Sequence, residues 1–89
     1  MVKVSVITVA FQSEGVIERT IESILAQDYT AIEYWIIEGA GTDRTIEIAN
    51  QYAECFREKG ISYHVVSEPD RGIYDAMNKG IQLATGDII

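Results

Sequence analysis

Hydrophobic positions along the chain switch between two spacings, which predict strands and helices in turn. Short runs rich in β-branched and aromatic residues predict three strands, at residues 4–9, 33–37 and 61–66. Apolar residues that recur every three or four positions predict three amphipathic helices, over residues 17–25, 46–56 and 73–84. The apolar end at 87–89 is typical of a fourth strand that has only begun.

Capping and turn residues mark the borders of these elements. Ser13 is expected to cap the first helix, Thr42 or Asp43 the second, and Gly60 to end the second. Repeated strand–helix units at this spacing predict an α/β fold, with a parallel sheet and helices on its faces. Because a strand usually has five or six residues and the fourth has only begun, we expect the chain to be the front part of a larger domain.

Composition and charge narrow the classes of function. The 89 residues contain 14 acidic and 7 basic side chains, a net charge of −7, which argues against a nucleic-acid binder that relies on phosphate contacts. The single cysteine, Cys55, excludes an internal disulfide and a cysteine-cluster zinc site. Neither a bilayer-spanning apolar run nor a signal-peptide pattern is seen, so we expect a cytoplasmic protein.

Ligands of open parallel sheets bind beyond the carboxyl ends of the strands, which selects the loops at 10–13, 38–43 and 67–72. A helix follows each loop, and its first backbone N–H groups favour an anion such as a pyrophosphate. Gly39-Ala40-Gly41 does not fit the dinucleotide fingerprint, since Arg44 takes the place of the third glycine. The Gly-Lys-Ser/Thr sequence of a P-loop does not occur either.

Three conspicuous residues are interpreted as structural. His64 lies alone within a predicted strand, and Trp35 alternates with apolar neighbours as a packing residue does. Cys55 lies on a predicted helix without a histidine in a plausible motif, so we expect an inert thiol.

The segment 68–81 combines a stiff turn with a charged helix face. Asp75, Asn78 and Lys79 share that face, a pattern equally typical of a solvated surface. Gly80 lies inside the same helix, where glycine costs ~1 kcal/mol relative to alanine, so we expect something to approach closely there. The apolar face of this helix is expected to hold Ile73, Met77, Ile81 and Ala84.

Four stretches also carry a family resemblance, namely Val4–Phe11, Ile21–Gln27, Ile36–Asp43 and Ser67–Ile81. Together with Ala84–Asp87 they cover essentially the whole chain, and they resemble the opening of family-2-type inverting glycosyltransferases of bacterial surface-polysaccharide synthesis. The resemblance implies the GT-A fold, a Rossmann-like nucleotide-binding half joined to an acceptor-binding half. Residues 1–89 would be the N-terminal nucleotide-sugar-binding part of that domain, with the C-terminal remainder absent.

The resemblance also implies donor-binding residues. The first loop packs on the base, an acidic residue after the second strand reads base or ribose, and a basic residue near 71 contacts base or phosphate. Glu38 stands where the family usually has aspartate, and Gln12 where it usually has asparagine. The complete implied set is Val9, Ala10, Phe11, Glu38, Gly39, Asp43, Arg71, Asp75 and Asn78.

The function implied by the resemblance is inverting transfer of a sugar from a nucleoside diphosphate, expected to be UDP, to a saccharide or lipid-linked acceptor. Mg²⁺ or Mn²⁺ would be held by an acidic pair expected soon after Ile89, with the catalytic base later still. The 89 residues alone are therefore expected to lack turnover. Peripheral association with the inner face of the membrane is also expected.

Alternatives from other classes remain open at this point. The chain could be a nucleotide-binding remnant or a non-catalytic subunit, or an interaction domain whose three loops are plain turns. A dinucleotide-dependent oxidoreductase is disfavoured by the failed glycine fingerprint. The unpaired sheet edge further predicts pairing between copies of the chain.

Overall fold

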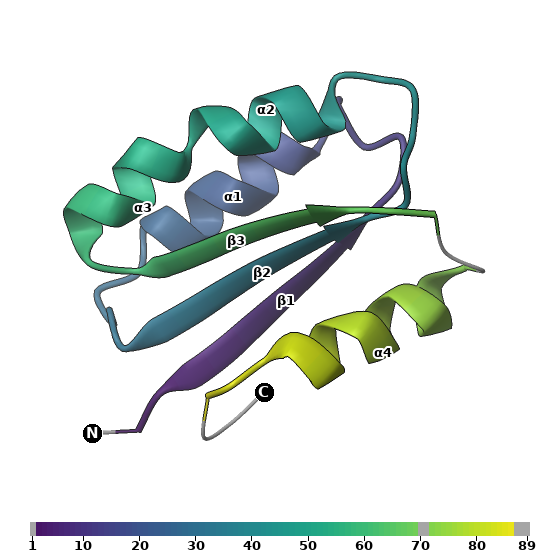
Figure 1. Cartoon of the computed structure of the whole chain (residues 1–89). Coiled ribbons are helices and arrows are strands. Elements are labelled where there is room, and N and C mark those ends of the chain that lie inside the picture. The colour runs from purple at the N-terminus through teal and green to yellow at the C-terminus, as the bar shows by residue number, and fades with distance from the viewer. Residues whose placement is uncertain (1, 70–71, 87–89) are drawn as a thin grey trace.

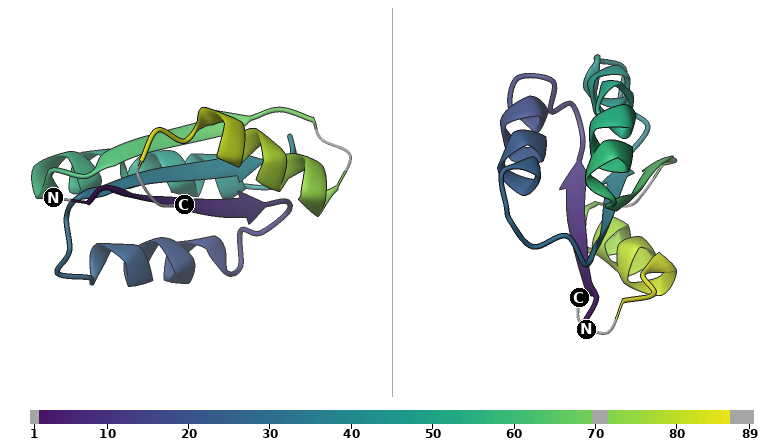
Figure 2. Two further views of the ribbon diagram at one scale, coloured as in Figure 1. Left: turned by 90° about the horizontal axis from the view of Figure 1, so that it is seen from below. Right: turned by 90° about the vertical axis from the view of Figure 1, so that its left-hand side faces the viewer.

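The computed structural model describes residues 2–69 and 72–86, with the backbone only for Ile73. In chain order the elements are β1 (Val4–Ala10), α1 (Ile17–Leu25), β2 (Ile32–Glu38), α2 (Thr45–Gln51), α3 (Ala53–Lys59), β3 (Ser62–Ser67) and α4 (Ile73–Leu83). The strands form one parallel sheet in the order β1-β2-β3, with α1, α2 and α3 on one face and α4 on the other (Figure 1 and Figure 2). The predicted α/β fold is confirmed.

The core lies between the sheet and the α1–α3 layer. The most buried strand is β2, because it is covered by helices on both faces and by a strand on each side. Its Tyr34 ring packs on Phe56 of α3 and on Tyr63 of β3, with centroids 5.5 and 5.7 Å apart. The Tyr34 hydroxyl is also hydrogen-bonded to Thr8 of β1 at 2.6 Å. Aromatic rings thus join all three strands to the helical layer.

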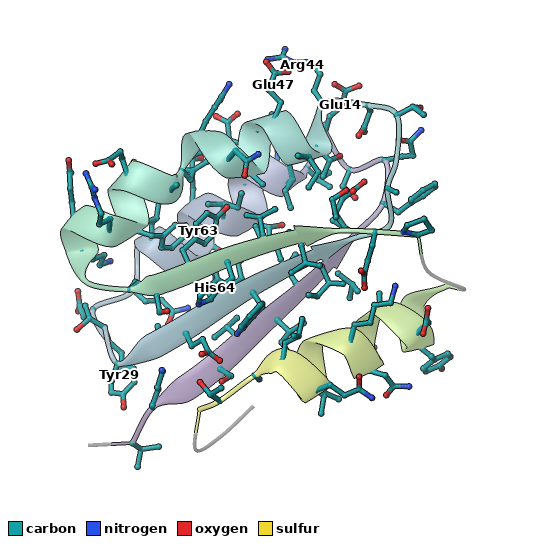
Figure 3. The ribbon with its side chains drawn as sticks, viewed as in Figure 1. Glu14, Tyr29, Arg44, Glu47, Tyr63 and His64 are labelled. Carbon is teal, nitrogen blue, oxygen red and sulfur yellow. The ribbon has the colours of Figure 1, made fainter. Side chains whose placement is uncertain are left out.

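The second predicted helix is wrong in one respect, because it is interrupted at Tyr52. The N–H of Tyr52 bonds to the carbonyl of Ala49 three residues earlier, at 3.3 Å, and φ and ψ are −92° and 0°. The same carbonyl accepts the Tyr63 hydroxyl at 2.5 Å. A side-chain donor that enters the helical ladder is a recognised cause of such breaks. Figure 3 shows Tyr63 on the side of β3 that faces α2.

The predicted cap of the first helix is also wrong. Helix α1 begins four residues after Ser13, whose hydroxyl donates to the carbonyl of Phe11 at 3.1 Å rather than capping the helix. The backbone carbonyl of Ser13 instead accepts the N–H groups of Val16 and Ile17. The prediction that Thr42 or Asp43 caps the second helix is wrong as well, because the N-cap of α2 is Arg44. Asp43 lies one residue before it, and its carboxylate accepts the N–H of Thr45 at 3.0 Å.

Helix α4 packs on the opposite face through its smallest residues. Ala76 and Gly80 are buried, and a Cβ on Gly80 would lie 2.7 Å from Cγ2 of Ile7 in β1, which confirms the expected close approach. The predicted apolar face is only partly covered, because Met77 and Ile81 remain 41% and 47% exposed. These two side chains line an apolar groove of about 390 Å³ beside β1.

A buried carboxylate fixes the end of α4. Glu33 accepts hydrogen bonds from the backbone N–H and the hydroxyl of Thr85, at 2.8 and 2.6 Å, and from the Ser5 hydroxyl at 3.1 Å. The N–H of Gly86 donates to the Ser5 oxygen at 2.9 Å. Burial alone would raise the pKa of Glu33, but the Thr85 and Ser5 donors outweigh it and lower the pKa from 4.5 to about 2.

The beginning of a fourth strand at 87–89 lies outside the described residues. Pairing between copies through an unpaired sheet edge stays a prediction. In the described ranges, 2–69 and 72–86, no helix is long and apolar enough to cross a bilayer.

The Gly80–Ile7 contact leads to a stability prediction. In Gly80→Ala the new methyl overlaps Ile7, and the resulting strain exceeds the gain in helix propensity, so we expect a net destabilisation of about 1 kcal/mol. Urea unfolding measures this difference. Gly15→Ala is the matched control, since a Cβ there meets nothing within 4 Å. Equal or greater stability of Gly80→Ala would contradict the packing described.

The Glu33 site leads to a prediction about acid. Because the pKa of Glu33 is lower in the folded chain, its stabilisation is fully present above pH 4.5 and is lost as the pH falls toward 2. The contribution of this pKa shift to the unfolding free energy is of the order of 3 kcal/mol. Glu33→Gln should therefore flatten the decline in unfolding free energy over this pH range, whereas Glu58→Gln, at an exposed carboxylate, should not. Parallel declines in both variants would refute the assignment.

Candidate functional site at the carboxyl ends of the strands

The three strands end side by side at one edge of the sheet. The register aligns Ala10 of β1 with Glu38 of β2, and Glu38 with Ser67 of β3. Backbone bonds from Gly39 to Ala10 and from Glu68 to Glu38, both 3.0 Å, continue the ladder one residue further. The predicted meeting of the three strand-end loops is therefore observed.

Glu38 holds the loop that follows β2. Its side chain is turned inward, with 1% of the residue exposed. The carboxylate accepts the N–H groups of Ala40 and Gly41 at 2.9 and 2.6 Å, and the hydroxyl of Ser67 at 2.6 Å. Each carboxylate oxygen is thus engaged by the protein itself, and one side chain joins the ends of β2 and β3.

Gln12 links the first loop to the second. Its amide oxygen accepts the backbone N–H groups of Thr42 and Asp43 at 2.8 and 3.1 Å, and its NH₂ donates to the Thr42 hydroxyl at 3.3 Å. Gly41 fits between Gln12 and Glu38, because a Cβ there would lie 3.2 Å from Cδ of Gln12 and 3.0 Å from Oε2 of Glu38. Only glycine allows both side chains to close on the loop.

Asp43 completes the connection between the loops. One carboxylate oxygen accepts the hydroxyl and N–H of Thr45, at 2.6 and 3.0 Å, and the other accepts the N–H of Glu14 at 3.1 Å. The Thr45 oxygen in turn accepts the N–H of Ser13 at 2.8 Å. The hydroxyl of Thr45, with these backbone donors, lowers the pKa of Asp43. We call Gln12, Glu38 and Asp43 the loop brace.

The braced loops contain two residues in an uncommon backbone conformation. Gln12 and Ala40 have φ values of 51° and 59°, in the left-handed region that costs a residue with a Cβ about 1–2 kcal/mol. Both lie next to the hydrogen bonds of the loop brace, which offset this cost. Such residues concentrate at binding sites, where the surrounding contacts hold them.

The first loop offers one large side chain to a ligand. Phe11 is 62% exposed, whereas Ala10 is buried in the core and Val9 is half-buried in β1. The Ser13 hydroxyl bonds to the N–H of Phe11 at 3.2 Å and to its carbonyl at 3.1 Å, so the backbone that carries the ring is fixed. An exposed aromatic ring on a fixed loop is suited to stacking on a planar base.

The third loop is tied to α4 by Lys79, which the sequence analysis placed on a helix face but not in the site. Its ammonium group donates to the carbonyl of Pro69 at 2.7 Å and pairs with Glu68 and Asp75 at 3.4 and 3.7 Å. Asp75 therefore bears on this loop through Lys79, while Asn78 is exposed. Arg71, the basic residue of the implied set, lies outside the described residues.

Sequence reasoning also missed Thr45 and Ser67 as partners of the loop brace. Their signal was weak, because single hydroxyl residues beside a strand end or helix start have many uses. Arg44, another basic side chain near this edge, pairs with Glu47 at 2.9 Å on the exposed side of α2 (Figure 3). That ion pair leaves Arg44 directed away from the loop brace.

The described side chains do not form a metal site. Across residues 2–69 and 72–86, no group of three or more histidine, cysteine, aspartate or glutamate side chains could hold an ion. His64 and Trp35, interpreted as structural, stack on each other with centroids 4.1 Å apart, in the sheet rather than at the loops. The described edge presents an exposed aromatic ring on loops held by side-chain hydrogen bonds, an arrangement suited to binding a planar group.

Comparison with known sequences gives a consistent picture. The model of the family described as Glycosyl transferase family 2 matches residues 5–89. The chain is 41% identical over 87 residues to an uncharacterised glycosyltransferase of Mycobacterium tuberculosis, covering 97% of this chain and 31% of the relative. It is 35% identical over 82 residues to a PGL/p-HBAD biosynthesis glycosyltransferase of Mycobacterium bovis, covering 92% of this chain and 31% of the relative. The chain thus spans less than a third of the length of these relatives.

A solved structure shows the same arrangement. The chain is similar to a mannosyltransferase of Pyrobaculum calidifontis, determined in complex with GDP-Man and Mn²⁺, with a TM-score of 0.87 and 28% identity. The similarity covers 97% of this chain and 25% of that one. The Rossmann-like GT-A architecture implied by the sequence is confirmed by this likeness. With the family match over residues 5–89, these findings show that the chain belongs to glycosyltransferase family 2.

Proposed function

We propose that the chain forms the donor-binding part of an inverting glycosyltransferase and that it binds a nucleoside-diphosphate sugar at the braced edge of the sheet. The main observation in support is the exposed Phe11 ring beside loops that the loop brace holds rigid. The similar mannosyltransferase was solved with GDP-Man. UDP is the carrier that we propose for this protein, with transfer to a saccharide or lipid-linked acceptor.

Within this proposal the first loop contacts the base, through Phe11 with Val9 and Ala10 behind it. Gly39 and Asp43 shape the second loop, where base and ribose would lie. Arg71 is proposed as the basic contact to base or phosphate. The bond between Asp43 and Thr45 and the paired ends of β1 and β2 support these roles.

Lys79 extends the proposal to the third loop. The contacts of Lys79 with Pro69, Glu68 and Asp75 support the proposal that Asp75 orders that loop, and Asn78 is proposed as a further support of the donor pocket. A divalent cation, Mg²⁺ or Mn²⁺, would offset the charge of the diphosphate. Since the described side chains provide no cluster of ligands, we assign no step to a metal on these residues.

A cytoplasmic location, with peripheral association at the inner face of the membrane, belongs to the same proposal. Binding without turnover, as in a non-catalytic subunit, is the alternative class. Membership of glycosyltransferase family 2 favours the enzyme over that alternative. Sugar release from a nucleoside-diphosphate sugar, assayed with the intact protein, discriminates the two.

The first test of donor binding concerns the exposed ring. Phe11→Ala removes the stacking surface, so we expect the affinity for UDP to fall by about 1–3 kcal/mol, roughly five- to 150-fold. Calorimetric titration of the intact protein, with and without Mn²⁺, measures this change. Phe11→Tyr keeps the aromatic face and is the matched control. UDP affinity that is unchanged in Phe11→Ala would remove the ring from the site.

The second test concerns the fit of Gly41 between Gln12 and Glu38. In Gly41→Ala the methyl group displaces both side chains, so we expect the loop brace to open and UDP affinity to fall by about tenfold. Gly15→Ala, in open space at the same end of the sheet, should bind UDP as the unaltered protein does. If both variants bind equally well, the conformation of the second loop does not matter for binding.

A further inference from the structure

Glu38 lies at the centre of the site, yet its carboxylate faces the protein. It is 1% exposed and accepts three hydrogen bonds, two from the backbone of the loop that follows it and one from Ser67. Bonds to a charged acceptor are among the stronger ones in proteins. Because the carboxylate is buried, a ligand could reach it only if the loop moved, and the N–H groups of Ala40 and Gly41 would then lose their acceptor.

The loop that Glu38 holds needs a restraint of this kind. Ala40 has a φ of 59°, which is unfavourable for alanine, and its N–H is one of the two held by the carboxylate. The opposite side of the loop is held by Gln12, which accepts the N–H groups of Thr42 and Asp43. Four successive amides, at 40–43, therefore point to side-chain acceptors rather than to solvent or ligand.

Other groups of this loop are available. Within the described residues the carbonyl oxygens of Gly39 and Ala40 accept no hydrogen bond, and Ala40 is exposed. A backbone carbonyl is an acceptor for the N–H groups on the edge of a base. The aromatic ring of Phe11, at the end of the neighbouring strand, has a face that every base can use.

Resting on the donor-binding function proposed above, we propose that Glu38 is a positioning residue: it sets the conformation of residues 39–43, and base selectivity comes from other groups of the site. The carboxylate then governs how tightly any nucleoside diphosphate binds. The backbone edge of the second loop governs which base is preferred, while Phe11 stacks on whichever base is bound. Glu38 differs in this from an acid that reads the base directly.

The experiment compares the affinities of the intact protein for UDP, GDP, CDP and ADP by calorimetry, in Glu38→Gln and in the unaltered protein. An amide group cannot accept from three donors as the carboxylate does, so we expect all affinities to fall by a similar factor of about ten. The ratio between the tightest and the weakest nucleotide should stay within about twofold. Amide hydrogen exchange at Ala40 and Gly41 should become faster in the free variant.

Two further variants test whether the change in affinity comes from the hydrogen bonds of Glu38 or from a general loss of stability. Ser67→Ala, at an exposed residue on the edge strand, removes one of the three bonds and should lower all affinities by about two- to threefold without a change in their order. Glu33→Gln, a buried carboxylate at the other end of the same strand, should destabilise the fold but leave the affinities within about twofold.

The results that would contradict the role of Glu38 differ from the result that would contradict donor binding. A collapse of the ratio between nucleotides in Glu38→Gln would mean that the carboxylate reads the base, and would overturn the proposal. So would unchanged exchange at Ala40 and Gly41. Should the unaltered protein bind none of the four nucleotides, the donor-binding function fails instead, and the exchange rates alone then decide whether Glu38 positions the loop.

Discussion

The structure depends on how the backbone groups at the carboxyl ends of its strands are satisfied. A parallel strand that ends in a loop leaves N–H groups without a ladder partner, and each such group must find another acceptor or water. Here the side chains of Gln12, Glu38 and Asp43 supply those acceptors. They accept the backbone N–H groups of residues 14, 40–43 and 45. The polar residues that make this edge suitable for a ligand are thus first of all the residues that hold its shape.

The two buried carboxylates of β2 show the same principle at both ends of the sheet. Glu33 and Glu38 lie five residues apart on one strand, so their side chains point to opposite faces. Glu33 fixes the end of α4, and Glu38 fixes the second loop. Each is buried with several donors around it, which is the condition under which a buried charge is tolerated. The central strand β2 is therefore held by a buried carboxylate near its first residue and by another at its last residue, beside the candidate site.

Sequence reasoning succeeded where the physics is local and failed where a partner comes from elsewhere in the chain. The strands followed from β-branched runs, and the cost of glycine in a helix indicated a close approach at Gly80, which the structure shows to be that of Ile7. The break at Tyr52 could not be predicted, because its cause is the hydroxyl of Tyr63 on another strand. The inward turn of Glu38 was equally hidden, since the hydroxyl of Ser67 is 29 residues away.

The same distinction explains which parts of the site the sequence identifies. A resemblance names positions, and it named Phe11 and Glu38 alike. The structure separates them by exposure, 62% against 1%, and so by the kind of contact each side chain is free to make. In the proposed site the exposed ring would stack on the base, and the buried carboxylate would act on the ligand through the loop it holds. In a chain with a net charge of −7, this arrangement also keeps the negative charge of Glu38 away from the surface that would receive an anionic diphosphate.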